Sequence, residues 1–315
     1  MSIVAFLIYP DFQILDLSGP LGVFENAARF QPGAYELCVV ADGGGLTRAS
    51  CGVSVTAQDF DTIDAADTLL VVGGRGTRAA ARNPRIRGFL QQSAPHLRRL
   101  GSVCSGTYVL AEAGVLDGLR ATTHWERSRH FAAAYPNICL EPDRIYVQDG
   151  RLWTSAGVTA GIDMALAMVA QDYGEALARR VAQELVVYYR RPGGQSQFMA
   201  LPEAGDGAFG ELMVWMRAHL CDRLDVERLA SQAGMSPRHF SRRFTAEVGL
   251  SPAQAVERLR LEAARARLEG GAAPAARIAR ETGFGDAERM RRAFVRGYGL
   301  SPQALRRRPQ DENVR

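Results

Sequence analysis

The sequence predicts two folding units: an α/β unit built on a buried parallel sheet with helices on both faces, and an all-α unit that carries two helix-turn-helix motifs. Three observations lead to this fold class. Short apolar runs alternate with helical patterns in the first part of the chain, a helix-glycine-helix pattern begins near residue 224, and that pattern returns about fifty residues later. The length of 315 residues and the hydrophobic content of 47% suit two separate cores.

Four runs of apolar and β-branched residues in the first unit have the length of buried strands. A strand that is covered on both faces of a parallel sheet is apolar without alternation, and these runs have that character. The expected strands are residues 3–8, 37–41, 69–72 and 100–103, and the expected helices between them include 20–29 and 86–97.

The fourth expected strand ends in GSVCSGTYVLAEAG, where small residues surround Cys104 immediately before a helix. A nucleophile elbow needs small neighbours because its central residue lies on a strained turn, which points the side chain into a cleft at a helix N-terminus. The pattern therefore predicts an elbow at Cys104, with a lowered thiol pKa and faster alkylation than at the other four cysteines. The alternative is a buried cysteine that packs as a small apolar residue.

Three further segments supply groups for a site around this thiol. Gly73 and Gly74 close the preceding strand, and their N–H groups are expected to form an oxyanion pocket with that of Ser105. His124, in ATTHW, is expected to orient the thiol or accept its proton, and Asp16, in LDLSGPLGVF, to add a carboxylate. Each side chain has a structural alternative: a histidine beside a tryptophan is commonly structural, and Asp16 also suits capping of the helix that follows it.

Residues 224–244, LDVERLASQAGMSPRHFSRRF, have the pattern of two short helices joined by a glycine turn. Gly234 supplies the turn, and a serine-proline pair starts the second helix. Phe240 and Phe244 are four residues apart and face the core together. The opposite face of this helix, which has the size to enter a DNA major groove, presents Arg238, His239, Ser241 and Arg242.

The same pattern recurs over residues 278–294, with Gly283 at the turn and Asp286 at the capping position of the second helix. Both copies end in Gly-Leu-Ser-Pro, so the chain contains an internal repeat. Residues 252–271 between them predict one helix of about 27 Å, long enough to place two reading helices about one DNA turn, roughly 34 Å, apart. Two helical hairpins that only pack in a core are the alternative interpretation.

Charge is divided unequally between the two units. The chain has no lysine, so arginine supplies all 38 basic residues, and the segment from Asp206 has 20 arginines against 14 acidic residues. A basic unit suits phosphate contacts, although the motifs and not the charge indicate DNA as the partner.

The five cysteines are scattered without paired spacing, which predicts neither disulfides nor a metal site. The N-terminal segment has no basic leader, and no apolar run reaches the length of a membrane span. We therefore expect a cytoplasmic protein without metal, cofactor or membrane partner.

Residues 212–308 closely resemble the DNA-binding domain of the AraC/XylS family of regulators, most clearly in LRLEAARARLE and ETGFGDAERMRRAF. The resemblance implies a seven-helix domain that binds double-stranded promoter DNA. It assigns base-facing positions to Arg238, Ser241 and Arg242 in the first recognition helix, and to Glu288, Arg289 and Arg292 in the second. The short Ala287 at the start of the second helix departs from the family and predicts weaker reading there.

Residues 2–191 resemble the class I glutamine amidotransferase-like superfamily, in particular its PfpI-like branch and the isonitrile hydratases. The likeness comprises YPDFQILDLSGPLGVF, the VVGG turn, the CSG elbow, ATTHW and TSAGVTAGIDMAL. It implies a flavodoxin-like α/β fold, with Asp16 and Cys104 in the places of the hydratases' acid and nucleophile. Ser105 departs from the threonine of the hydratases, which counts against hydratase activity.

Together the two resemblances identify the chain as a member of the GlxA-type branch of AraC/XylS regulators. They divide it into a sensor and dimerisation domain at 1–192, a linker at 193–206, a DNA-binding domain at 207–310 and a tail at 311–315. This branch commonly lacks catalysis, so we expect a ligand pocket rather than an enzyme site at Asp16, Gly74, Cys104, Ser105 and His124.

The protein implied by the resemblance is a homodimeric transcription factor that responds to a small effector, with nitrogenous metabolites as one class, and that works with RNA polymerase. Two alternatives stay open. One is an isonitrile hydratase-like or amidase-like cysteine enzyme that carries a DNA-binding domain, and the other is a redox sensor that acts through Cys104.

Overall fold

The computed structural model divides the chain into two compact units, Met1–Arg191 and Pro192–Arg315. It describes residues 1–62, 66–189, 194–195, 207–269 and 273–306. Only residues 194 and 195 of the predicted linker are among these, and the predicted tail, 311–315, lies outside the described residues.

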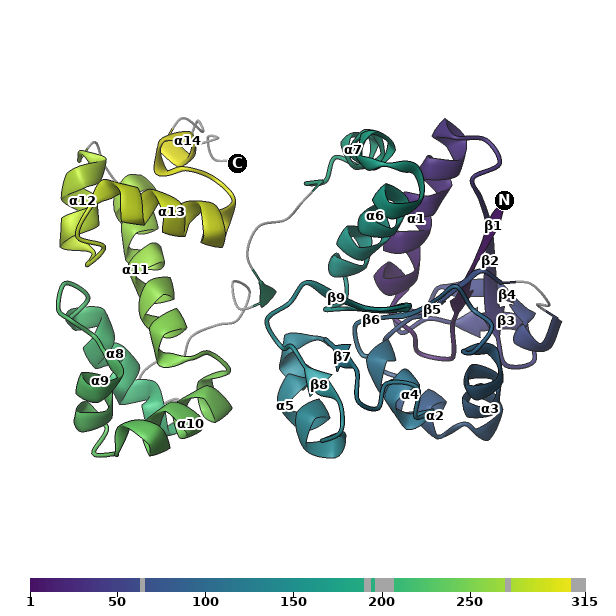
Figure 1. The fold of residues 1–315 in the computed structure, drawn as a ribbon, viewed down its shortest axis with the longest axis horizontal. Helices are drawn as coiled ribbons and strands as arrows, with labels where there is room; N and C mark the ends of the chain where they lie inside the picture. The colour runs from purple at the N-terminus through teal and green to yellow at the C-terminus, as the bar shows by residue number, and fades with distance from the viewer. Residues whose placement is uncertain (63–65, 190–193, 196–206, 270–272, 307–315) are drawn as a thin grey trace. The chain divides into compact units, whose positions relative to one another are not determined.

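The described residues of the first unit form an eight-stranded sheet in the order β3-β4-β2-β1-β5-β6-β10-β9 (Figure 1). Six strands run parallel, whereas β3 and β9 at the edges are antiparallel to their neighbours. The sheet is therefore mostly parallel, as predicted, with an antiparallel strand at each edge. The strands are β1 (Ser2–Leu7), β2 (Tyr35–Ala41), β3 (Gly45–Arg48), β4 (Ser54–Asp59), β5 (Thr68–Val71), β6 (Arg99–Val103), β9 (Tyr146–Asp149) and β10 (Leu152–Ser155).

The four strands predicted from the sequence are β1, β2, β5 and β6, which lie next to one another in the sheet. Their residues form much of the core, and Val4, Leu70 and Leu100 have no exposed surface. Among the strands that were not predicted, β3 is short and mostly exposed, and β4 alternates polar and apolar residues along a partly exposed strand. A separate pair, β7 (Arg120–Ala121) and β8 (Cys139–Leu140), lies outside this sheet.

Helices cover both faces of the sheet, as predicted. Figure 1 shows α1, α6 and α7 on one face and α2 to α5 on the other. The first helix begins before Pro20, where the sequence analysis placed its start, because Leu17 is also buried against the core. These helices are α1 (Ile14–Phe30), α2 (Thr77–Arg82), α3 (Pro84–Ser93), α4 (Gly106–Glu112), α5 (Trp125–Ala134), α6 (Ala160–Tyr173) and α7 (Glu175–Glu184).

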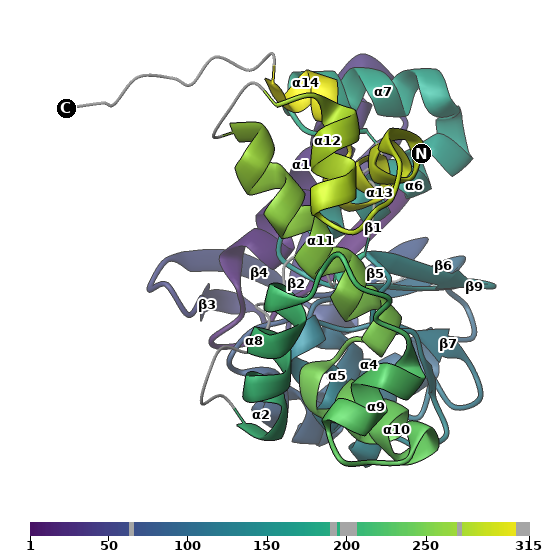
Figure 2. The ribbon, with the colours of Figure 1, turned by 90° about the vertical axis from the view of Figure 1, so that its left-hand side faces the viewer.

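The described part of the second unit contains seven α-helices, as the family resemblance implied. Figure 2 shows α11 running from the α9–α10 pair to the α12–α13 pair. Its Leu259 packs in the core of the first pair, and its Leu261 and Leu268 pack in the core of the second. The helices are α8 (Gly210–Ala218), α9 (Val226–Gln232), α10 (Pro237–Val248), α11 (Pro252–Glu269), α12 (Ala275–Glu281), α13 (Ala287–Tyr298) and α14 (Pro302–Arg306).

Residues 270 and 271, which the sequence analysis included in the connecting helix, lie outside the described residues. Within the described ranges, no helix of either unit is long and apolar enough to cross a membrane.

Candidate functional site

Cys104 lies on a sharp turn between a buried strand and a helix. β6 ends at Val103, α4 begins at Gly106, and Cys104 between them has a φ of 57°. A positive φ is uncommon for a residue with a Cβ atom and marks a strained turn. The predicted elbow is therefore confirmed.

Two glycines from other segments enclose the Cys104 side chain. A Cβ atom on Gly157 would lie 2.6 Å from the Cys104 sulfur, and one on Gly73 would lie 2.8 Å from the Cys104 Cβ. Gly73 follows β5 and Gly157 follows β10, the two strands that flank β6. Only glycine leaves room for the thiol at these two places.

Asp16 is fully buried in the first turn of α1, next to this thiol. Its Oδ1 accepts the backbone N–H of Val158 at 2.8 Å, and Oδ2 has no hydrogen bond of ordinary geometry among the described residues. Burial raises the pKa of Asp16 to about 6, while the Val158 N–H and the Cys104 thiol act in the opposite direction. Because the carboxylate reaches across to residue 158, the helix-capping interpretation of Asp16 was wrong.

The thiol of Cys104 is harder to ionise than the sequence analysis predicted. Burial, and then the negative charge of Asp16, raise the pKa of Cys104 far above its usual range, although part of the residue is exposed. The backbone and side chain of Ser105 lower this pKa, but their effect is smaller. The prediction of a lowered pKa was wrong because it considered the adjacent helix start and not the carboxylate and desolvation supplied by distant segments.

Ser105 is held by the turn that follows β5. Its Oγ accepts the Gly74 N–H at 3.0 Å and shares a hydrogen bond of 2.8 Å with the Thr77 hydroxyl. Thr77 also donates to the Gly74 carbonyl at 2.7 Å. The Gly74 N–H that was expected to stabilise an oxyanion is therefore already occupied by Ser105.

His124 is fixed by the helix that it starts. It is the N-cap residue of α5, and its Nδ1 accepts the backbone N–H of Glu126 at 3.4 Å. Burial lowers the pKa of His124, which favours the neutral ring. Among the described residues no hydrogen bond joins His124 to Cys104, so a role of His124 toward the thiol stays a prediction.

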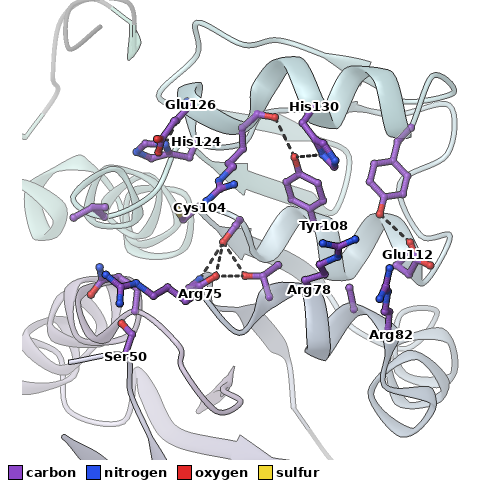
Figure 3. A pocket seen from close by; sticks show the side chains of 18 residues that line it. Ser50, Arg75, Arg78, Arg82, Cys104, Tyr108, Glu112, His124, Glu126 and His130 are labelled. Carbon is purple, nitrogen blue, oxygen red and sulfur yellow. Dashed lines mark hydrogen bonds between the residues drawn. The ribbon is translucent and has the colours of Figure 1, made fainter. Parts of the chain in front are cut away.

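Cys104, Ser105 and His124 all line one cavity of about 700 Å³. Figure 3 shows His124, Glu126 and His130 along one side of this cavity, and Arg75, Arg78 and Arg82 along the other. Gly74 also lines it, whereas Asp16 lies behind the elbow and is not part of the wall. A concave site of this volume suits a small-molecule ligand.

The arginines of this cavity were not identified from the sequence. Arg75, Arg78 and Arg82 come from GRGTRAAAR, directly after the VVGG turn, and Arg127 comes from α5. The spacing of Arg78 and Arg82 along α2 was the available signal, but only the packing of α2 against α4 brings these two residues to the elbow.

In the second unit, α10 presents the predicted basic face. Arg238, His239 and Arg242 are exposed and Ser241 is partly buried, while Phe240 and Phe244 on the opposite face are fully buried. Gly234 takes the expected left-handed turn, with a φ of 65°. Ser236 occupies the N-cap position, but its side chain makes no capping hydrogen bond.

The second predicted recognition helix, α13, differs from α10 in the pairing of its charged side chains. Asp286 caps it as predicted, because its carboxylate accepts the Arg289 N–H at 2.7 Å. Glu288 pairs with Arg291 at 2.7 Å and lies 3.9 Å from Arg292, and Arg291 lowers its pKa. In contrast, neither Arg238 nor Arg242 of α10 pairs with a carboxylate in the described part of the chain.

Comparison with protein families places these two units in known groups. Residues 2–171 match the DJ-1/PfpI family, and residues 229–308 match a helix-turn-helix domain. The transcriptional regulator GbdR of Pseudomonas aeruginosa is 26% identical over 95% of this chain and 83% of its own length. The regulator GlxA of Rhizobium meliloti is 31% identical over 87% of this chain and 86% of its own, and isonitrile hydratase of Pseudomonas putida is 33% identical over 58% and 77%.

Proposed function

This chain belongs to the DJ-1/PfpI family and, in its whole organisation, to the GlxA-type branch of the AraC/XylS regulators, and from this premise we propose that it is a sequence-specific transcription factor controlled by a small ligand. The observation that carries the proposal is the combination of a ligand-sized cavity in one unit with two arginine-bearing reading helices in the other. Action on promoter DNA implies a cytoplasmic location.

The proposed DNA contacts begin with α10. Arg242 is exposed, lacks a carboxylate partner among the described residues and stands on a helix that is anchored by Phe240 and Phe244. An arginine with this freedom can pair bidentately with guanine in the major groove. On α13, Glu288 partly neutralises the cations beside it, and Ala287 offers little to the bases, so we assign that helix the smaller share of affinity.

The proposed role of the cavity is binding without catalysis. A nucleophilic cysteine must ionise, but burial and Asp16 raise the pKa of Cys104, and the Gly74 N–H donates to Ser105 instead of facing a substrate. These features support a sensor. They also count against a redox role for Cys104, since a thiolate is the form that oxidants attack.

We further propose that the first unit pairs with its copy and that RNA polymerase is recruited at the promoter. In a regulator, effector binding must change the free energy of DNA binding. A dimer provides a simple link, because a ligand that changes how the first units pair also changes the spacing of the two DNA-binding units. Pairing also raises the effective concentration of the second DNA-binding unit. Sedimentation of the full chain, with and without a bound ligand, tests this part of the proposal.

The central experiment selects binding sites for the full chain from a randomised duplex library and then compares variants on the selected and scrambled duplexes. Arg242→Ala is expected to lower discrimination at one base pair by about 1–3 kcal/mol, with little change in binding to the scrambled duplex. Arg243→Ala is the matched control on the same helix, because Arg243 pairs with Glu247 at 2.8 Å. Failure to enrich any sequence would contradict the proposed function.

The alternative function is a cysteine hydrolase or hydratase, which the partial similarity to isonitrile hydratase favours. It predicts turnover of an isonitrile or amide panel by the full chain, with complete loss in Cys104→Ala. We expect no turnover, and we expect Cys104→Ala to retain binding to the selected duplex without ligand. Turnover that depends on Cys104 would favour the enzyme.

A further inference from the structure

Four arginines of the cavity have no carboxylate partner in the described part of the chain. Arg75 and the α2 residues Arg78 and Arg82 line one side, and Arg127 of α5 also lines the cavity. All four are exposed and none forms an ion pair with a described aspartate or glutamate. Four like charges around one concavity raise its electrostatic potential, because the protein walls focus the field.

The two acidic residues of the cavity offset only half of this positive charge. Glu112 accepts the Tyr135 hydroxyl at 2.8 Å, and Glu126 lies close enough to His124 to raise that residue's pKa. Burial is nevertheless the larger effect on His124 and lowers its pKa. The ionisable lining is therefore two positive charges in excess when the histidines are neutral.

Outside the cavity, seven of the twelve described arginines of this unit form an ion pair with a carboxylate. Arg98 pairs with Asp67 at 2.8 Å, Arg120 pairs with Glu141 at 3.2 Å, and Arg85 pairs with Asp42 and Asp61. The four cavity arginines, none of which is paired with a described carboxylate, are thus gathered around one concavity. The backbone of Arg127 is fixed to α4, because its carbonyl accepts the hydroxyl of Tyr108 at 3.0 Å.

We propose that this cavity binds a small organic anion that carries carboxylate groups. A guanidinium presents two parallel N–H donors that match the two oxygens of a carboxylate, and such charge-assisted pairs are among the strongest hydrogen bonds in proteins. The inference rests on the proposed sensing role of the cavity and adds the charge of the effector. It disfavours quaternary amines and other cations that lack an acid group, whereas an amino acid fits through its carboxylate.

The test measures binding of a fixed panel to the full chain by calorimetric titration at constant ionic strength. The panel contains butyrate, succinate, succinamide as the neutral isostere of succinate, choline, and inorganic phosphate. We expect binding of a carboxylate in clear preference to succinamide and choline. No carboxylate binding at 10 mM, equal binding of succinamide, or binding of phosphate alone would overturn the carboxylate assignment.

Substitutions of cavity arginines test whether these residues bind the carboxylate. Arg78→Gln and Arg127→Gln are each expected to weaken carboxylate binding by about 10-fold or more, because each removes a charge-assisted pair. Arg129→Gln is the control, since Arg129 is exposed on α5 but does not line the cavity. Unchanged affinity in both cavity variants, or equal loss in the control, would refute the assignment.

A separate readout distinguishes the inference from the proposed function. Affinity for the selected duplex is measured with and without the carboxylate that binds. Carboxylate binding without any change in DNA affinity would leave the anion site standing and remove the sensing role. A change in DNA affinity caused by an uncharged ligand in the same cavity would keep the sensing role and overturn the anion site.

Discussion

Replacement of Asp16 by asparagine should remove a pH-dependent contribution to the stability of the first unit. Asp16 has no exposed surface, and burial raises its pKa from 3.8 to about 6. A carboxyl group whose pKa is higher in the folded state binds its proton more tightly there. Its stabilising contribution is therefore fully present below about pH 4 and is lost as the pH rises through about 6.

The size of the effect follows from the shift. About two pKa units correspond to about 3 kcal/mol in total, of which about 1.4 kcal/mol is lost between pH 5 and pH 8. Asparagine does not titrate and its Oδ1 can still accept the Val158 N–H. The free energy of unfolding of Asp16→Asn, relative to the native chain, should therefore increase by about 1.4 kcal/mol over that range.

Calorimetric unfolding of the full chain at pH 5, 6, 7 and 8 measures this difference. Asp117→Asn, at an exposed carboxylate of the same unit, is the control and should keep the slope of the native chain. Asp16→Asn should also speed alkylation of Cys104 at pH 8, because it removes the Asp16 charge that raises the thiol pKa. Parallel stability curves for Asp16→Asn and the native chain would refute the reasoning.

Three further outcomes are expected. Cys104 should react with iodoacetamide near pH 7.5 more slowly than the three exposed cysteines, as measured by mass spectrometry of the alkylated peptides; equal or faster labelling would contradict the raised pKa. Arg292→Ala should reduce affinity for a selected duplex less than Arg242→Ala, as measured by titration, because Arg292 lies near a carboxylate of its own helix; the reverse order would contradict the ranking. Gly157→Ala should lower the melting temperature by several degrees more than Gly114→Ala, since both glycines have a positive φ but only at Gly157 would the new Cβ meet Cys104; equal losses would show that the crowding is unimportant.

The helix-turn-helix unit could be predicted from its sequence in detail. Gly234 and Gly283 have the left-handed turns that glycine favours, and Asp286 caps its helix as its position suggested. Phe240 and Phe244 are buried because residues four apart share one face of a helix. These features depend on contacts between near neighbours in the chain, which is why the sequence pattern was sufficient.

The sheet could be predicted only in its centre. β5 and β6 are fully buried and β1 is mostly buried, and each of β1, β2, β5 and β6 contains a run of apolar residues that the sequence shows directly. The edge strand β3 has an exposed face and acquires its strand character by pairing with β4. The antiparallel edges were consequently missed.

By itself the sequence determined the elbow at Cys104, the two reading helices and the division into an α/β and an all-α unit, because small residues, glycine turns and apolar periodicity act within a few residues of one another. The tertiary structure decided the chemistry of the site. Asp16, Gly73 and Gly157 are distant from Cys104 in sequence, yet their packing desolvates the thiol and places a carboxylate beside it, so the pKa rises instead of falling. Charge and solvent exclusion act through space. The direction in which they shift the pKa of a residue therefore depends on segments that are distant from it in the sequence.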